Sequence, residues 1–452
     1  MRDCEPATAT LLNHLPGNWG WPILGSAIPL VKDVRAFTQA RVARYGLISK
    51  LRLGNEYGAM VVGAENFKTI LTDPQQRFST RNGYINQLGR FYEGGLLLRD
   101  FDNHKAHRRL LQQAFKFSTM RHYVQRLSTA LGSALEQWPT DRQFSFHDAI
   151  KPLLLDVGSD IFLGLQPSSD DARTLNQAFL AIGDGLGSVF HWDLPGTRIR
   201  RGLNGRRTLH AYIGNRVSER RTSDASDMFS LLARATLEDG ATFSDEEVIQ
   251  HVAFLLFAAH DTTTSLLSHL MLYIGAEPQY QHQLREVFAD IDKNTLSWEA
   301  LDGMPLVQNV LDETLRLHPP VPLMTRRTTA AISLGGIDLP PGTLLYMPSY
   351  YNHYDPQYWR EPTRFDPNRF EESRQEHKQH SFCWHPFGGG AHKCIGMHFA
   401  YLLSKIFLIE LLGRFQISLP NNHTPSLDWV PIPKPADGPP VRLTPITTSP
   451  SR

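Results

Sequence analysis

The 452-residue chain is predicted to fold as one mainly α-helical unit with a small β subdomain. Helical periodicity dominates residues 102–274, whereas short strand-like runs occur near residues 49–62 and 322–347. Length alone would allow two or three domains. No linker-like stretch divides the sequence, so we expect a disordered lead at residues 1–14 and a single domain at residues 15–452.

The composition excludes several classes of protein. There are 46 basic and 45 acidic residues, and a net charge of +1 gives no support for nucleic-acid binding. Three cysteines cannot form a disulfide framework in so long a chain, which suits a reducing compartment. Prolines and glycines interrupt residues 11–30, so no stretch there reaches the ~20 apolar residues of a membrane span. We expect a soluble, cytoplasmic protein of bacterial type without a transmembrane anchor.

The smaller elements follow from local signals. Residues 49–53 and 59–62 are expected to be strands on either side of a glycine-containing turn. Further segments are expected as follows: a helical region with a break at residues 191–205, strands within residues 322–347, a loop-rich stretch at residues 352–390, a last helix at residues 396–413 with a glycine C-cap, and an extended proline-rich tail.

One long helix is predicted to begin after Ser244, which forms a capping box with Glu247. The next glycine or proline is Gly275, about 31 residues later, which corresponds to a length on the order of 46 Å. Residues 260–265 are polar and interrupt its apolar sequence. Six polar residues at a bilayer centre are unfavourable, so we expect a buried helix whose polar middle serves a site. Threonines there can bond the carbonyl one turn back and loosen the helix.

A lone cysteine lies in a glycine-rich loop near the C-terminus, where residues 387–396 read FGGGAHKCIG. The glycines allow the backbone to fold closely around the Cys394 sulfur. The dipole of the following helix is expected to favour the thiolate, which is a good ligand for haem iron. The plain alternative is a buried structural cysteine. Cys4 and Cys383 lack the glycine frame and are not rival ligands.

This loop resembles the haem-ligand loop of the cytochrome P450 family, with Cys394 in the iron-ligand position. The resemblance extends from Leu15 to about Arg442. It implies the P450 fold, with a long central helix and the cysteine loop before the last long helix, together with a haem b cofactor and monooxygenase activity. Residues 194–207 and 384–387 look most like the retinoic-acid hydroxylase branch. This implies an elongated hydrophobic substrate, such as a terpenoid, retinoid or fatty acid.

The resemblance assigns proton delivery during oxygen activation to Asp261 and Thr262. Ala259 stands where the family usually has glycine, and its methyl group is expected to crowd the oxygen groove. His260 is interpreted as a structural histidine rather than a ligand.

Other roles are likewise implied by position in the family motifs. The residues expected to bind haem are Phe387 in the loop and, toward the propionates, His104, Arg108, Arg326 and His392. A buried structural cluster is expected from Glu313, Arg316 and Arg369, and loss of any member should unfold the loops beside the haem. The substrate pocket is expected to include Leu97, Phe254, Ala258, Val321 and Leu323.

The implied reaction uses O2 and electrons from NAD(P)H. Because no redox module is seen in the sequence, a separate ferredoxin or flavodoxin with its reductase is expected to dock near Lys393. The basic run at residues 198–207 could guide a substrate carboxylate or form a solvated face. Alternative functions are a haem-thiolate peroxygenase or isomerase, and a non-catalytic haem sensor. The acid–alcohol pair on the long helix argues against them.

Overall fold

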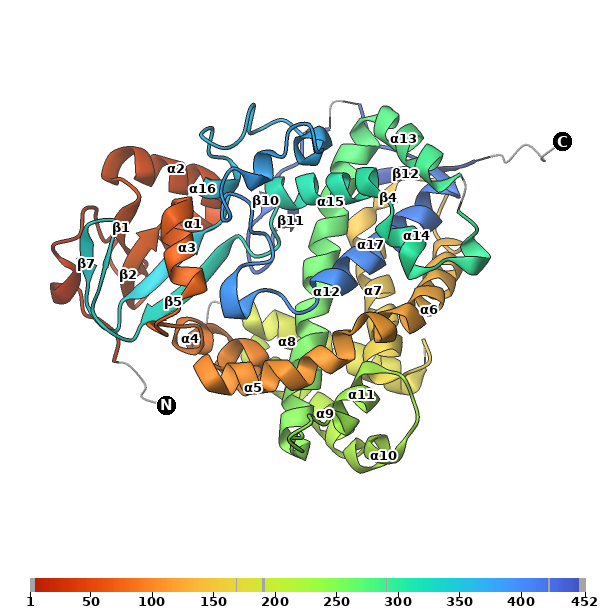
Figure 1. Cartoon of the computed structure of the whole chain (residues 1–452), viewed down its shortest axis with the longest axis horizontal. Helices are drawn as coiled ribbons and strands as arrows, with labels where there is room; N and C mark the ends of the chain where they lie inside the picture. Colours follow the sequence, from red (N-terminus) through yellow and green to blue (C-terminus); the bar gives the residue numbers. More distant parts are fainter. Residues whose placement is uncertain (1–4, 168, 189–191, 290, 422, 447–452) are drawn as a thin grey trace.

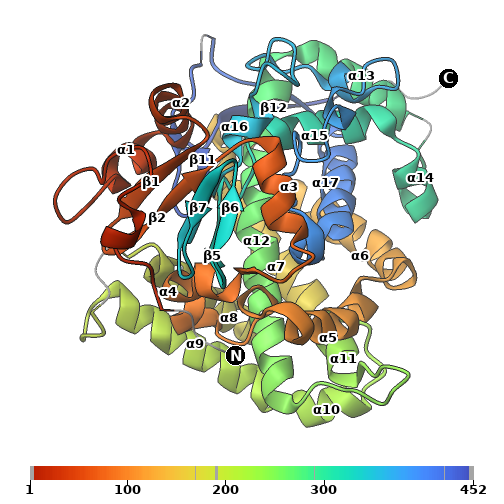
Figure 2. The same cartoon turned by 60° about the vertical axis from the view of Figure 1, so that its left-hand side comes forward.

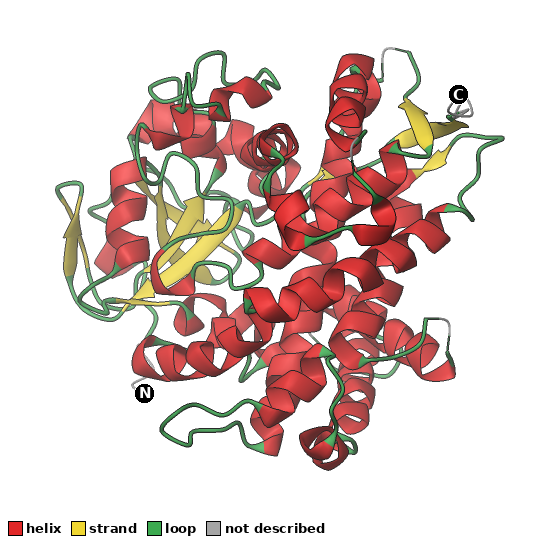
Figure 3. Cartoon of the chain, turned by 45° about the vertical axis from the view of Figure 1, so that its right-hand side comes forward, coloured by secondary structure: helices red, strands yellow, loops and turns green. Residues whose placement is uncertain are grey.

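The computed structural model describes residues 5–167, 169–188, 192–289, 291–421 and 423–446. Helices make up most of this structure, and the larger sheet lies on one side of it (Figure 3). The predicted mainly α-helical fold with a small β subdomain is therefore confirmed.

The β subdomain contains a five-stranded sheet with the order β1-β2-β8-β5-β3. Its hairpin of β1 and β2 corresponds to the two strands predicted near the N-terminus, and β8 adds parallel to β2. The strands of this subdomain are β1 (Ile48–Leu53), β2 (Glu56–Val61), β3 (Phe78–Ser79), β5 (Leu323–Thr328), β6 (Ile332–Leu334), β7 (Ile337–Leu339) and β8 (Leu344–Pro348).

The C-terminal tail forms strands as well, which the sequence did not predict. β12 pairs with β9 and with β4, and β10 pairs with β11. The partner strand β4 precedes β12 by almost 300 residues, so no local sequence pattern predicts this pairing. The bounds are β4 (Phe144–Ser145), β9 (Phe415–Ser418), β10 (Leu427–Asp428), β11 (Lys434–Pro435) and β12 (Pro440–Pro445).

The lead expected to be disordered is in fact packed from residue 5 onward, while residues 1–4 lie outside the described residues. Ala7 and Leu12 are buried in the core of the β subdomain. The backbone N–H of Ala7 donates to the carbonyl of Gly342 at 3.0 Å. Apolar contacts with the sheet thus order a segment that has little structure of its own.

The helices surround one large core. They are α1 (Ala27–Lys32), α2 (Val34–Tyr45), α3 (Ala64–Thr72), α4 (Arg81–Tyr92), α5 (Phe101–Leu111), α6 (Phe117–Leu135), α7 (Phe146–Leu163), α8 (Asp170–Leu186), α9 (Arg198–Gly214), α10 (Val217–Thr222), α11 (Met228–Arg234), α12 (Asp245–Ala276), α13 (Pro278–Phe288), α14 (Trp298–Asp302), α15 (Pro305–Leu317), α16 (Tyr350–His353) and α17 (Met397–Leu412). The predicted break at residues 191–205 is wrong for residues 198–205. Thr197 caps α9, and the basic run that follows it is helical.

Helix α12 crosses the centre of the molecule (Figures 1 and 2). Its predicted capping box is present, with the Ser244 hydroxyl and the Glu247 carboxylate each bonding the other residue's backbone N–H. The helix stays continuous through its polar middle, so the threonines do not break it. The expected start of the long helix and its burial are both confirmed.

Helix α17 follows the cysteine loop as predicted and ends at Gly413. Gly413 has φ −74°, so it caps the helix without using a left-handed conformation. Among the described residues, only the segment Gly390–Leu412 is long and apolar enough to be a candidate membrane span, and 67% of its most apolar window is buried inside the protein. This burial is typical of a core helix.

Candidate active site

The cysteine loop is held in shape by its own backbone and by α3. The N–H of Cys394 donates to the carbonyl of Phe387 at 2.9 Å, which closes the loop. Gly388 and Gly390 have φ angles of +70° and +61°, the left-handed region that favours glycine. A Cβ on Gly390 would lie 1.7 Å from the carbonyl oxygen of Leu71. Glycine is therefore required at position 390, because the loop backbone touches the end of α3.

Cys394 is accessible to solvent, although protein atoms are densely packed around it. Burial raises the pKa of this thiol, and the N–H of Gly396 and the charges of Arg108 and Lys393 oppose that rise without reversing it. Burial thus acts against the thiolate form that the sequence analysis expects at this position. Coordination to a metal ion would favour deprotonation of Cys394.

Basic side chains from three parts of the chain converge near Cys394. His104 and Arg108 lie on α5, Arg326 on β5 and His392 in the loop. The rings of His104 and His392 stack with centroids 3.8 Å apart. Burial, followed by the charges of neighbouring basic groups, lowers the pKa of His104 to about 4 and that of His392 to about 2. The neighbouring arginines therefore disfavour the charged forms of both histidines.

This basic group fits the two propionates of a haem. Among the residues that the structure describes, His104, Arg108, Arg326 and His392 form no ion pair, and the buried Nε2 of His104 has no hydrogen-bond partner. Buried basic groups without an acidic partner are unfavourable unless an anion is supplied. A dianionic cofactor that presents iron to Cys394 would supply it, so the residues present fit haem.

Asp261 and Thr262 lie on α12, where both are half-buried. The Thr262 hydroxyl donates to the carbonyl of Ala258 at 2.7 Å, the back-bond expected for threonine in a helix. Oδ1 of Asp261 lies 3.2 Å from Nζ of Lys151 on α7. Burial raises the pKa of Asp261, but His260 and Lys151 outweigh burial and hold the pKa at about 2. Asp261 is therefore ionised at neutral pH.

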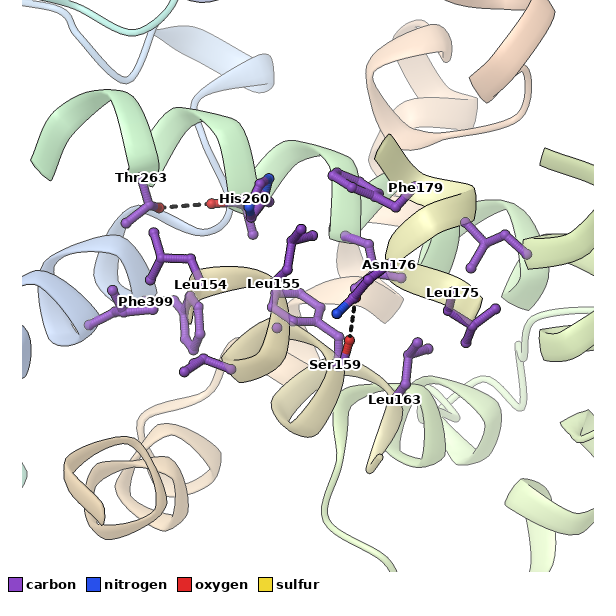
Figure 4. Close-up of a pocket in the computed structure, with 17 residues that line it drawn as sticks. Leu154, Leu155, Ser159, Leu163, Leu175, Asn176, Phe179, His260, Thr263 and Phe399 are labelled. Carbon is purple, nitrogen blue, oxygen red and sulfur yellow. Dashed lines mark hydrogen bonds between the residues drawn. The ribbon is translucent and has the colours of Figure 1, made fainter. Parts of the chain in front are cut away.

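A separate cavity of about 560 Å³, including its open mouth, lies between α7, α8 and α12 (Figure 4). Ala259, His260 and Thr263 line it, but Cys394 does not. With Leu256, these residues form one stripe of α12 at helical spacing, different from the stripe of Ala258 and Thr262. Ala259 thus borders this cavity, and the effect of its methyl group on the oxygen groove stays a prediction.

Glu313, Arg316 and Arg369 meet in a fully buried cluster. Arg316 donates two hydrogen bonds to the Glu313 carboxylate, at 2.7 and 2.8 Å, and Nε of Arg369 lies 3.2 Å from the same carboxylate. Glu376, which sequence reasoning missed, adds a second carboxylate 2.9 Å from Arg369. Glu376 is far from the ExxR motif in the sequence, so no local pattern connected the two.

The five residues expected in the substrate pocket differ in environment. Leu97, Ala258 and Leu323 are half-buried, Val321 is exposed, and Phe254 is buried. Phe254 fills the space beside Gly95: a Cβ atom on Gly95 would lie 2.7 Å from the Phe254 ring. It also packs edge-on against Tyr92, whose ring stacks on Phe257 of the same helix. Phe254 therefore supports the packing of α4 on α12.

The remaining predicted residues are placed as follows. Phe387 packs edge-to-face against Tyr401 of α17, with ring centroids 5.2 Å apart. Lys393 is exposed beside Cys394. Cys383 is buried in a small aromatic cluster with Trp359 and Phe370, and Cys4 lies outside the described residues.

Sequence reasoning missed Lys151 as the ionic partner of Asp261. It lies more than a hundred residues earlier in the chain, in the first half of α7 and directly before Pro152. No sequence signal connects it with α12. The contact between His260 and Asp261 was also missed, although the position of His260 beside Asp261 in the polar centre was the available signal.

The fold and the glycine-framed cysteine define a haem-thiolate enzyme, and comparison with known proteins names the family. The family model described as Cytochrome P450 matches residues 15–435, so the chain belongs to the cytochrome P450 family and is a monooxygenase. The implied P450 fold and the use of haem, O2 and a redox partner are therefore properties of its family.

Individual relatives agree with this assignment. Cytochrome P450 136 of Mycobacterium tuberculosis is 32% identical over 446 residues, covering 98% of this chain and 90% of that protein. Abscisic acid 8'-hydroxylase 3 of Oryza sativa is 27% identical, with 94% and 85% covered. The solved structure of retinoic acid-bound cyanobacterial CYP120A1 has a TM-score of 0.86 and 27% identity, with 96% and 99% covered. The predicted resemblance to the retinoic-acid branch is thereby confirmed.

Proposed function

We propose that this P450 binds haem b through Cys394 and hydroxylates or epoxidises an elongated isoprenoid or fatty-acid-like acid. Its electrons come from NAD(P)H through a separate ferredoxin or flavodoxin with its reductase. The observation that carries the proposal is the convergence of unpaired basic side chains beside a glycine-framed cysteine. The exposed Lys393 next to Cys394 offers a cation to an acidic redox partner.

When bound, the haem supplies oxygen activation. The protein's own residues supply binding, orientation and protons. Cys394 provides the sulfur ligand, and the four basic side chains hold the propionates. Asp261 is kept ionised by His260 and Lys151, so it can accept and release a proton beside the Thr262 hydroxyl.

The acid class of substrate is supported by two relatives and by one arginine. The names of the relatives include retinoic acid and abscisic acid, both isoprenoid carboxylic acids. Within the basic run, Arg206 is half-buried and its Nε donates to the carbonyl of Phe91 on α4 at 3.1 Å. It therefore brings a guanidinium to the helix that packs on α12 through Tyr92.

We expect retinoic acid to shift the haem from low to high spin with a Kd at least tenfold lower than that of retinol. One charge-assisted hydrogen bond contributes about 1.5–3 kcal/mol, and tenfold corresponds to about 1.4 kcal/mol. Optical titration measures both values. Arg206→Gln should reduce the preference for the acid, while Arg207→Gln, at an exposed neighbouring position, should keep it. Equal affinity for acid and alcohol would contradict the acid class.

Thr262→Ala should uncouple electron use from product formation. Loss of the hydroxyl removes a proton-transfer group, so we expect product formation to fall on the order of a hundredfold while NAD(P)H is still consumed and peroxide is released. Product, NAD(P)H and peroxide are measured in the same reaction. Thr264→Ala is the matched control, because Thr264 makes the same back-bond, to the His260 carbonyl, from another face of α12. Unchanged coupling in Thr262→Ala would refute the role.

A further inference from the structure

His260 occupies a position between two oxygen atoms of α7 and α12. Its Nε2 lies 3.0 Å from the backbone carbonyl of Lys151, and its Nδ1 lies 3.1 Å from Oδ1 of Asp261. The ring is buried and packs edge-on against Phe179 of α8, with centroids 5.2 Å apart. Figure 4 shows His260 on the wall of the cavity beneath α12.

Both neighbours of the imidazole can only accept hydrogen bonds. A carbonyl oxygen has no proton, so Nε2 must carry the proton of that contact. Asp261 is ionised, so an unprotonated Nδ1 would place its lone pair against a carboxylate oxygen. The distances therefore favour an imidazolium with a proton on each nitrogen. Nδ1 is buried and has no aligned hydrogen-bond partner among the described residues, so this proton is held mainly by charge.

The charged and titratable groups that interact with His260 or with its partner Asp261 come from three helices. Lys151 and His147 lie on α7, Asp261 on α12, and Tyr92 on α4 interacts electrostatically with Asp261. Lys151 and His260 both lie against Oδ1 of Asp261. The cation Lys151 acts against a second positive charge on His260, whereas the carboxylate of Asp261 favours it. The proton on Nδ1 is thus retained by one carboxylate and opposed by one ammonium group.

We propose that His260 is a positioning residue that stores a proton for Asp261. This inference rests on the proposed role of Asp261 in proton delivery and adds the residue that recharges it. The proton moves from Nδ1 of His260 to Oδ1 of Asp261. An imidazolium–carboxylate pair becomes a neutral imidazole and a carboxylic acid, so the transfer creates no net charge. Asp261 then passes the proton toward Thr262, and His260 regains one from solvent water.

The proposal is tested directly by histidine nitrogen NMR of the holoenzyme in its reduced CO form. The His260 signal is the one that is missing in His260→Gln, a variant whose amide can still donate to the Lys151 carbonyl. We expect both ring nitrogens of His260 to be protonated at pH 7. In Asp261→Asn we expect the signal of Nδ1 to become that of an unprotonated nitrogen at pH 7, because the carboxylate that retains the proton is gone, whereas in Lys151→Met the signal should shift while both nitrogens stay protonated. A proton on Nε2 alone at pH 7, or no change in Asp261→Asn, would overturn the proposal.

Turnover gives a second readout. His260→Gln should lower product formed per NAD(P)H severalfold and enlarge the solvent isotope effect. The matched control is His269→Gln, at a buried histidine of the same helix whose Nδ1 contacts the carbonyl of Ser265 at 2.8 Å and not a carboxylate. Equal coupling in both variants would overturn the role. If His260→Gln does not fold, the signal that moves in both Asp261→Asn and Lys151→Met identifies His260. If the wild type forms no product at all, the proposed function fails, while the NMR result still decides the protonation of His260.

Discussion

Replacement of Cys394 by alanine is expected to abolish thiolate ligation of the haem completely. Alanine has no atom that can bond to iron, and Cys383, the other described cysteine, is buried in a separate aromatic cluster. The basic residues that we propose to hold the propionates remain in place. Haem binding and thiolate ligation can therefore be separated, with haem content measured by extraction and ligation by the CO difference spectrum of the reduced protein.

Cys383→Ala is the matched control for this substitution. The Cys383 thiol is buried, its pKa is raised by burial to about 11, and its sulfur lies 3.4 Å from the carbonyl of His377. It has no basic groups arranged for a cofactor. We expect Cys383→Ala to keep the long-wavelength CO band typical of thiolate-ligated haem. A full band in Cys394→Ala would show that another ligand holds the iron.

Glu313→Gln is expected to lower the free energy of unfolding by about 3–5 kcal/mol, because it leaves buried guanidinium groups without their shared carboxylate. Glutamine keeps the size of the side chain, so the effect comes from charge and hydrogen bonding. Arg316 and Arg369 both donate to Glu313, and only Arg369 has a second carboxylate, that of Glu376. We expect a lower urea midpoint and lower haem occupancy.

The chain contains an unusually close control for this prediction. Glu361 and Arg364 have the same three-residue spacing as Glu313 and Arg316, and their charged atoms lie 3.5 Å apart. Their side chains, however, are 59% and 67% exposed, whereas those of the buried pair are 0% exposed. Exposed pairs contribute about 0–1 kcal/mol, so Glu361→Gln should change stability little. Equal losses in the two variants would mean that burial does not set the contribution of this cluster.

The sequence predicted much of the fold because the relevant signals are local. The capping box at Ser244 and the glycine spacing around Cys394 act within one or two turns of the backbone. The hairpin of β1 and β2 was predicted for the same reason. The tail strands were missed because their edges are completed by segments from elsewhere in the chain, and the order of residues 5–14 was missed because it depends on packing against the sheet.

The sequence by itself determined the cysteine in its glycine frame, the long helix with its polar centre and the family to which they belong. Only the tertiary structure decided that one ExxR pair is buried and the other exposed, and that Lys151 and His260 meet at Asp261. The physical reason is the range of the forces involved. Capping hydrogen bonds and backbone preferences act between near neighbours in the sequence. Burial sets the strength of the interactions between charged groups, and it depends on the packing of the whole chain.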